Sequence, residues 1–183
     1  MKRITIINGM SDNSYLTLEH ELEVILNKNK ANIEFECFDL RNMDINYCCG
    51  CWSCWVKTPG RCIQEDEMPR LLKSMINSHL TVFVSPVHMG FVSANIKKVN
   101  DKMIPLLHPY IGIFNGECHH IKRYDQYPKL GLILVDRISY GKDSYDMITS
   151  IYQRLAINMK TELAFSILSD GNMEEVDYAI SHL

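Results

Sequence analysis

The sequence predicts a three-layer α/β/α domain in which five parallel strands, in the order 2-1-3-4-5, lie between two layers of helices. Three observations favour this architecture. The chain has 183 residues, close to the usual size of a single domain. It is 46% hydrophobic and 22% charged, which is enough apolar material for a substantial core. Strand-like and helix-like patterns alternate along it, and right-handed crossovers between such elements give a parallel sheet covered on both faces.

The expected strands are short apolar or alternating segments. Residues 2–8 form a β-branched run, and residues 33–37 alternate between apolar and acidic side chains. One solvated face suits a strand at the edge of a sheet. Cys37 is expected in the core, on the apolar face of this strand. The other three strands are nearly continuous apolar runs, at residues 80–85, 130–135 and 163–168.

Between these strands, apolar side chains recur at three- and four-residue steps, which predicts amphipathic helices. We expect helices over about 14–29, after a cap at Asp66, around 96–103, from Asp143 to about 155, and over about 173–180. Two segments have no such period: a cysteine-rich loop at about 41–65 and a long irregular loop at about 105–128. Connections of this length are more often functional than structural.

Charge and hydropathy exclude several classes of function. Nineteen basic and 22 acidic residues leave a formal net charge of −3, which provides no basic surface for nucleic acid. The apolar runs are far shorter than the roughly 20 residues that cross a bilayer. The first of them is too short for a secretory signal. We therefore expect a cytoplasmic protein without a nucleic-acid or membrane partner.

The cysteine-rich loop holds five of the seven cysteines within 15 consecutive residues. Four of them have the compact spacing that suits one iron–sulfur cluster: Cys48, Cys51, Cys54 and Cys62. Zinc sites of four cysteines usually join two separated pairs, which makes zinc the second choice. The alternative to a metal site is a loop of reduced thiols with a structural role. Cys49 is the spare thiol of the group.

In a parallel sheet of this order, ligands bind beyond the carboxyl ends of the strands, where the strand order reverses. The loops expected there are residues 8–14, 86–90 and 136–141, and the cysteine-rich loop leaves the same edge. A strand-to-helix turn offers backbone N–H groups and a helix dipole to an anion. Asp12 adds a negative charge to the first of these turns, so an ordinary capped turn is the alternative there.

Two segments resemble a known family. The run from Cys48 to Cys62, and the run Ser85-Pro86-Val87-His88-Met89-Gly90, are similar to the flavodoxin-like NAD(P)H-dependent FMN reductases, and most of all to their iron–sulfur flavoprotein branch. Lys97, Asp101 and Lys102 resemble the helix that follows, with Lys102 where an Arg is usual. The resemblance covers about residues 1–104. It implies a flavodoxin-like fold, FMN, NAD(P)H as co-substrate and a 4Fe-4S cluster on the four cysteines.

The resemblance also implies where FMN binds. Its phosphate is expected on small or polar residues of the first turn: Gly9, Ser11, Asn13 and Ser14. The usual Gly-Ser-Pro-Arg opening of the family is absent from this turn. Exposed backbone amides of a second loop are expected against the flavin ring: Pro86, Val87, His88, Met89 and Gly90. His88 replaces an aromatic residue of the family. No general acid or base is required, so we expect no catalytic side chain.

The loop at 105–128 contains a second group of polar residues. His108, Glu117, Cys118, His119 and His120 are of types that bind zinc or iron, but adjacent histidines rarely aim at one ion, and a polar interface loop is the preferred interpretation. Residues 123, 124 and 127 are Arg, Tyr and Tyr, which fit a subunit contact or a lid over the cofactor. We expect a homo-oligomer, a dimer or tetramer.

The leading hypothesis is an FMN-dependent NAD(P)H oxidoreductase that passes electrons from a reduced nicotinamide, through FMN, to a cluster or to a small-molecule or protein acceptor. The first alternative is an electron-transfer flavoprotein without nicotinamide activity. The second is a cysteine module that senses metals or redox state and has lost FMN, which Asp12 in the phosphate turn favours.

Overall fold

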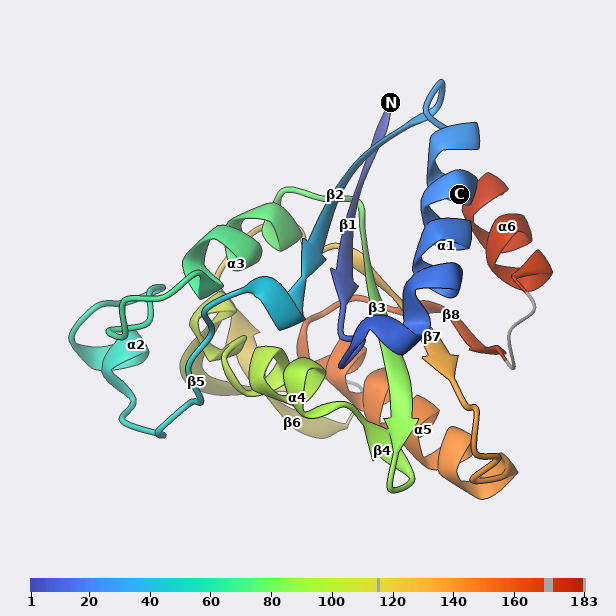
Figure 1. Ribbon diagram of the computed structural model, residues 1–183. Coiled ribbons are helices and arrows are strands. Elements are labelled where there is room, and N and C mark those ends of the chain that lie inside the picture. The colour runs from blue at the N-terminus through green and yellow to red at the C-terminus, as the bar shows by residue number, and fades with distance from the viewer. Residues whose placement is uncertain (115, 170–172, 183) are drawn as a thin grey trace.

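The computed structural model of the chain describes residues 1–114, 116–169 and 173–182 (Figure 1). Its central sheet has the strand order β2-β1-β3-β7-β8, with β4 paired to β3. The strands are β1 (Lys2–Asn8), β2 (Ile33–Asp39), β3 (Leu80–His88), β4 (Phe91–Val92), β7 (Lys129–Val135) and β8 (Leu163–Ser169). All pairs except β3 with β4 are parallel. The predicted fold and order are confirmed, since β7 and β8 are the fourth and fifth parallel strands.

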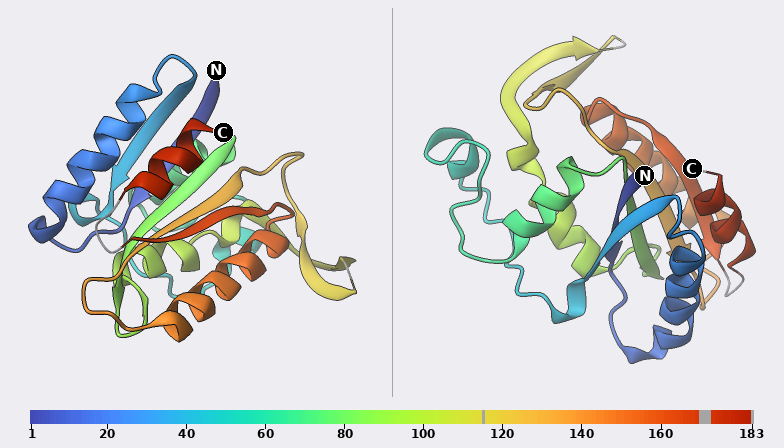
Figure 2. Two further views of the ribbon diagram at one scale, coloured as in Figure 1. Left: turned by 90° about the vertical axis from the view of Figure 1, so that its right-hand side faces the viewer. Right: turned by 90° about the horizontal axis from the view of Figure 1, so that it is seen from above.

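Helices cover both faces of this sheet (Figure 2). The helices are α1 (Leu16–Lys28), α2 (Ser53–Val56), α3 (Met68–Ile76), α4 (Ala94–Asp101), α5 (Lys142–Asn158) and α6 (Glu174–Ser181). Apolar residues of α1 and α6 share one core with the sheet, and those of α3, α4 and α5 share the other. Burial of these apolar stripes is the main source of helix stability in such a fold.

The stretch predicted to be irregular contains a second, two-stranded antiparallel sheet. It is formed by β5 (Leu107–Phe114) and β6 (Glu117–Lys122), and it extends from the body of the molecule (Figure 2). The prediction failed because the strand carries its large apolar side chains toward solvent. Tyr110, Ile111 and Ile113 are 66%, 57% and 76% exposed, so no buried periodicity marks the strand.

Two further expectations need correction. Cys37 is exposed rather than buried, because β2 is an edge strand whose deeply buried residues are Ile33 and Phe38. β3 does not end at residue 85 but continues to His88 and turns back into β4 through Met89 and Gly90, which have φ of 50° and 75°. Positive φ at both turn residues is the geometry of a tight hairpin.

A close contact holds the end of β1 against the start of α4. The hydroxyl of Ser93 donates to the Gly9 carbonyl oxygen at 2.7 Å, and the Ser93 N–H donates to Ser85 Oγ at 2.8 Å. A β-carbon at Gly9 would lie 2.2 Å from Cγ1 of the fully buried Ile96. Only glycine allows this approach, which we call the Gly9–Ser93 contact.

A buried ion pair fixes the end of the cysteine-rich loop. Lys102, directly after α4, donates to Asp66 and to Gln64 Oε1, and the side chains of Lys102 and Asp66 are 1% and 0% exposed. Asp66 also accepts the N–H groups of Asn46 and Met68. Both ends of the loop are thereby joined to α3 and α4. Burial opposes the charged form of Asp66, yet these hydrogen bonds lower its pKa below the usual value.

Removing one charge of this pair should destabilise the fold. We expect Asp66→Asn to lower the free energy of unfolding by about 3–5 kcal/mol, since it leaves a buried lysine without a counter-charge. The matched control is Asp101→Asn in the exposed Lys97–Asp101 pair of α4, where we expect a loss of about 0.5 kcal/mol or less. Urea unfolding at neutral pH measures both. Equal losses in the two variants would contradict the assignment.

The same pair predicts a pH dependence. The folded-state pKa of Asp66 lies below its ordinary value of 3.8, so the pair contributes its full stability above that pH. The contribution is then lost as the pH falls through the lower folded-state pKa. Between pH 5 and 3, the difference in unfolding free energy between the wild type and Asp66→Asn should therefore shrink. A difference that grows on acidification would show that the carboxyl is protonated in the fold.

The Gly9–Ser93 contact predicts a coupling between two residues. Gly9→Ala should lower the free energy of unfolding by about 1–3 kcal/mol, because the added carbon overpacks a close-packed site. In the background of Ile96→Ala the same substitution should have a much smaller effect, since the clashing atoms are gone. Urea unfolding of the two single variants and the double variant measures this coupling. Strictly additive losses would mean that the contact does not restrain Gly9.

Candidate functional site

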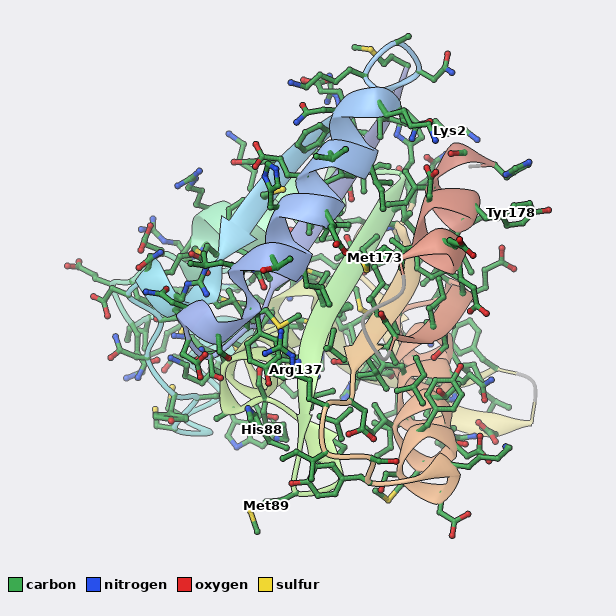
Figure 3. The ribbon with its side chains drawn as sticks, turned by 45° about the vertical axis from the view of Figure 1, so that its right-hand side comes forward. Lys2, His88, Met89, Arg137, Met173 and Tyr178 are labelled. Atoms are coloured by element: carbon green, nitrogen blue, oxygen red, sulfur yellow. The ribbon has the colours of Figure 1, made fainter. Side chains whose placement is uncertain are left out.

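Two of the expected loops meet at the carboxyl edge of the sheet. The hydroxyl of Ser11, in the turn after β1, lies 3.4 Å from Nε2 of His88, at the end of β3. His88, Met89 and Arg137 share one rim of the molecule, whereas Lys2 and Tyr178 lie toward the opposite end (Figure 3). The structure therefore brings together the turn and the hairpin that the sequence assigned to one ligand.

The predicted contact residues differ in their accessibility. Ser11, Asn13 and Ser14 are exposed, whereas Gly9 is buried in its contact with α4. Pro86 and Val87 are buried strand residues, paired with Val135 and Val92 respectively. The expected row of exposed amides is thus shorter than predicted. His88 and Met89 are the exposed residues of the hairpin, and Met89 is 93% exposed.

Asp12 caps the turn after β1 with its own carboxylate. Its Oδ1 accepts the N–H of Ser14 at 2.8 Å, and its Oδ2 accepts the hydroxyl of Ser11 at 3.2 Å. These hydrogen bonds lower the pKa of Asp12, led by those from Ser14, so the carboxyl is ionised at neutral pH. Two other N–H groups of the turn are also paired, that of Gly9 with the Val84 carbonyl and that of Met10 with the Asn8 side chain.

Two arginines that the sequence analysis missed flank this turn. Arg41 donates to the backbone carbonyl of Asp12 at 2.8 Å and pairs with Glu19 and Asp39 at 2.7 and 3.1 Å. Arg137 donates to the carbonyl of Ser14 at 2.9 Å and lies 4.3 Å from the ring centre of Tyr15. Their positions in the sequence could have indicated them, because each arginine lies two residues after the carboxyl end of a parallel strand.

The third loop of this edge is organised by a single carboxylate. Asp136 accepts the N–H groups of Ile138, Ser139 and Tyr140 at 3.1, 2.8 and 2.8 Å. The loop borders a cavity of about 550 Å³ between α5 and α6. Sequence reasoning assigned no contact to this loop. Because Asp136 accepts the hydrogen bonds of these three N–H groups, the loop presents side chains rather than backbone donors to a ligand.

Among the four predicted thiols of the cysteine-rich loop, Cys54 is close enough to the other three to be influenced by their charge. Burial raises the pKa of the Cys54 thiol, and the nearby thiols of Cys62, Cys48 and Cys51 raise it further. Cys54 and Cys62 are half-buried, whereas Cys48 and Cys51 are exposed. Within residues 1–114, 116–169 and 173–182, no three potential ligand side chains are arranged to hold a metal ion. The donor set suits an iron–sulfur cluster chemically, but closing around one would require the loop to rearrange.

An aromatic contact joins the cysteine-rich loop to the β5–β6 hairpin. The indole N–H of Trp55 donates to the carbonyls of Ile104 and Leu107 at 3.1 and 3.0 Å. One face of Trp55 stacks on Trp52, and the ring of His120 lies 4.9 Å away between ring centres. The two tryptophans therefore anchor α2 on β5 and β6.

The polar residues of the β5–β6 hairpin make structural contacts rather than a metal site. Glu117 accepts from buried His119 at 3.0 Å and pairs with Arg154 at 2.6 Å, which binds β6 to α5. Arg123 and Tyr127 donate to the carbonyls of Pro105, Leu106 and Leu107 at the base of the β5–β6 hairpin. Their predicted role in a lid or subunit contact stays a prediction. His108 is near Tyr110, and Cys118 is exposed.

A cavity of about 1320 Å³ lies at the opposite edge of the sheet. It is bordered by the first residues of β1, β3 and β7 and by α6, including Lys2, His79, Lys129, Tyr178 and His182. Ligands of parallel α/β sheets bind at the carboxyl edge, where loops replace strand pairing. We therefore place the candidate site at the rim of His88 and Arg137. No helix among the described residues has the length and apolar character needed to cross a bilayer.

Comparison with known proteins identifies the family of this chain. The sequence model of the NADPH-dependent FMN reductase family matches residues 2–114. An iron–sulfur flavoprotein of Archaeoglobus fulgidus is 35% identical over 78 residues, which are 43% of this chain and 34% of that protein. One of Methanocaldococcus jannaschii is 35% identical over 77 residues, 42% of this chain and 39% of that protein. The match thus spans well under half the length of these curated relatives.

Solved structures show the same fold. An FMN-dependent NADH-azoreductase of Bacillus anthracis, in complex with FMN, has a TM-score of 0.64 at 14% identity and covers 100% of this chain and 95% of its own. The Trp repressor binding protein of Bacillus subtilis has a TM-score of 0.59 at 14% identity, and the match covers 98% of this chain and 99% of that protein. At such identities the likeness concerns the fold alone. Because the family model covers more than half of the sequence, this chain belongs to the NADPH-dependent FMN reductase family.

Proposed function

We propose that this protein is a flavin-dependent NAD(P)H oxidoreductase with FMN bound at the rim of His88 and Arg137. The observation that carries the proposal is the contact of Ser11 with His88, which joins the turn after β1 to the β3–β4 hairpin at the switch point of the sheet. Family membership and the FMN-bound structural neighbour support a flavin as the ligand. Flavodoxin-like sheets hold FMN at this point.

The residues of the chain would bind and orient the cofactor. The unpaired side of the β1 turn, from Ser11 to Asn13, faces the ribityl end, and the exposed ring of His88 provides a donor or a stacking surface to the isoalloxazine. The Gly9–Ser93 contact keeps these two parts at a fixed separation. A bound flavin supplies the redox chemistry, accepting a hydride from a reduced nicotinamide and releasing electrons to an acceptor.

We also propose that Cys48, Cys51, Cys54 and Cys62 bind an iron–sulfur cluster that takes electrons from the flavin. Similarity to two iron–sulfur flavoproteins supports this assignment, as does the gathering of the other three thiols near Cys54. Zinc, or a purely structural loop, remains the alternative. A small molecule or a protein is then the final electron acceptor.

Assembly and location remain predictions. The exposed apolar side chains of β5 support a homo-oligomer, because apolar surface of this kind is commonly covered by a second copy. Sedimentation at micromolar concentration should give a mass of two or four chains, and a single monomeric species would contradict it. A cytoplasmic location is the remaining expectation from the sequence.

Nicotinamide oxidation tests the proposed activity directly. Anaerobically purified protein loaded with FMN should oxidise NADH or NADPH. The flavin absorbance should bleach at a rate close to the rate of nicotinamide oxidation. His88→Ala should lower the rate because a ring contact is lost, whereas Cys118→Ser, an exposed position on β6, should leave it unchanged. If FMN is bound but neither nicotinamide reduces it, while a reduced partner protein does, the protein is an electron carrier instead.

Iron counting tests the proposed ligands. Cys54→Ser should abolish bound iron and sulfide after anaerobic reconstitution, because it removes the central thiol of the group. The flavin content should not change. Cys37→Ser is the matched control, since that exposed thiol lies on β2, outside the cysteine-rich loop. An unchanged iron count in Cys54→Ser, or equal losses in both variants, would refute the assignment.

A further inference from the structure

The turn that should receive the flavin phosphate already contains an anion. A phosphate at the start of a helix is held by free backbone N–H groups and by the positive end of the helix dipole. Here the Ser14 N–H is bonded to the carboxylate of Asp12 at 2.8 Å, and the N–H groups of Gly9 and Met10 are bonded to Val84 and Asn8. Ser11, Asp12 and Asn13 supply the N–H groups that remain for an external ligand in this part of the described chain.

The surrounding charges do not compensate for this anion. The turn contains the carboxylate of Asp12, and two guanidiniums, those of Arg41 and Arg137, donate to its carbonyls. Two further carboxylates, those of Glu19 and Asp39, pair with Arg41. Arg41 is held in ion pairs by Glu19 and Asp39, and its side chain is only 16% exposed. One net negative charge is therefore present before a ligand arrives. His88, which also faces the turn through Ser11, adds a positive charge only when protonated.

A phosphate monoester brings nearly two further negative charges at neutral pH. To bind FMN with its phosphate in this turn, the protein must either move Asp12 away from Ser14 or hold two anions at close range. Both lower the affinity for the phosphate. Riboflavin has the same ring and ribityl chain without the phosphate, and it meets neither penalty.

We propose that Asp12 is an intramolecular competitor for the flavin phosphate, so that the site binds riboflavin about as tightly as FMN. This inference rests on the proposed flavin site at the rim of His88 and Arg137. It assigns to Asp12 the role of a specificity-determining residue, which acts on the phosphate end of the ligand and not on the ring. The three N–H groups that stay free in the turn are enough to orient a ribityl hydroxyl.

The test is an equilibrium titration of riboflavin and of FMN, followed by flavin fluorescence, with the wild type and with Asp12→Asn. Asparagine is nearly isosteric and remains a good cap for the turn, so the variant removes the charge and keeps the fold. In the wild type the two dissociation constants should agree within about threefold. In Asp12→Asn the dissociation constant of FMN should fall about tenfold or more, and that of riboflavin should change by less than about twofold.

Glu21→Gln provides the matched control, since it makes the same change of charge at an exposed position of α1 outside the turn. It should leave both dissociation constants within about twofold, which excludes an effect of net charge alone. A thermal melt of each variant without flavin checks that the fold is retained.

The outcomes separate the two proposals. If the wild type binds FMN about tenfold or more tightly than riboflavin, or if Asp12→Asn leaves the affinity for FMN unchanged, the role of Asp12 is refuted and the flavin site stands. If neither the wild type nor Asp12→Asn binds either flavin, the proposed flavin site is refuted, and the role of Asp12 with it. A gain of FMN affinity in Asp12→Asn, without a gain in Glu21→Gln, supports both the flavin site and the role of Asp12.

Discussion

The approach of β1 to α4 at Gly9 is the constraint on which the candidate site depends. The hydroxyl of Ser93 donates to the Gly9 carbonyl. Gly9 has no β-carbon, and Ile96 fills the space that the β-carbon of any other residue would occupy. Ser85 extends the same chain of hydrogen bonds into β3, whose end forms the hairpin with His88. A turn from the first strand and a hairpin from the third are thereby held at one rim. Without this contact, a ligand that needs both would meet two independent loops.

Much of the architecture could be predicted because burial leaves a periodic pattern in the sequence. The three inner strands are continuous apolar runs, and α3 places Met68, Leu71 and Met75 on one buried face. The β5–β6 hairpin could not be found in this way, since its apolar residues face solvent and make no period against a core. Pro86 and Val87 were placed at the site by resemblance, yet pairing with Val135 and Val92 buries them. The ion pair of Arg41 with Glu19 is a long-range contact between the segment after β2 and α1, and the sequence pattern does not reveal such a pairing.

Helix α4 connects the candidate site with the cysteine-rich loop. At one end of α4 lies the rim of His88, through Ser93 and Gly9. At the other end lies Lys102, whose buried amine binds Gln64 and Asp66, at the end of the cysteine-rich loop. α4 therefore spans the distance between the rim and the cysteine-rich loop, and the bulk of Trp55 fixes that loop against β5.

The central claim is that flavin binds at the carboxyl edge of the sheet and not in the larger cavity at the amino edge. Amide hydrogen exchange, measured by mass spectrometry with and without saturating riboflavin, tests it most directly, because it locates the ligand without any substitution. The account predicts slower exchange in peptides that cover residues 9–15 and 88–92, with no change around Lys2, His79 and Tyr178. Protection confined to the amino-edge peptides would contradict it.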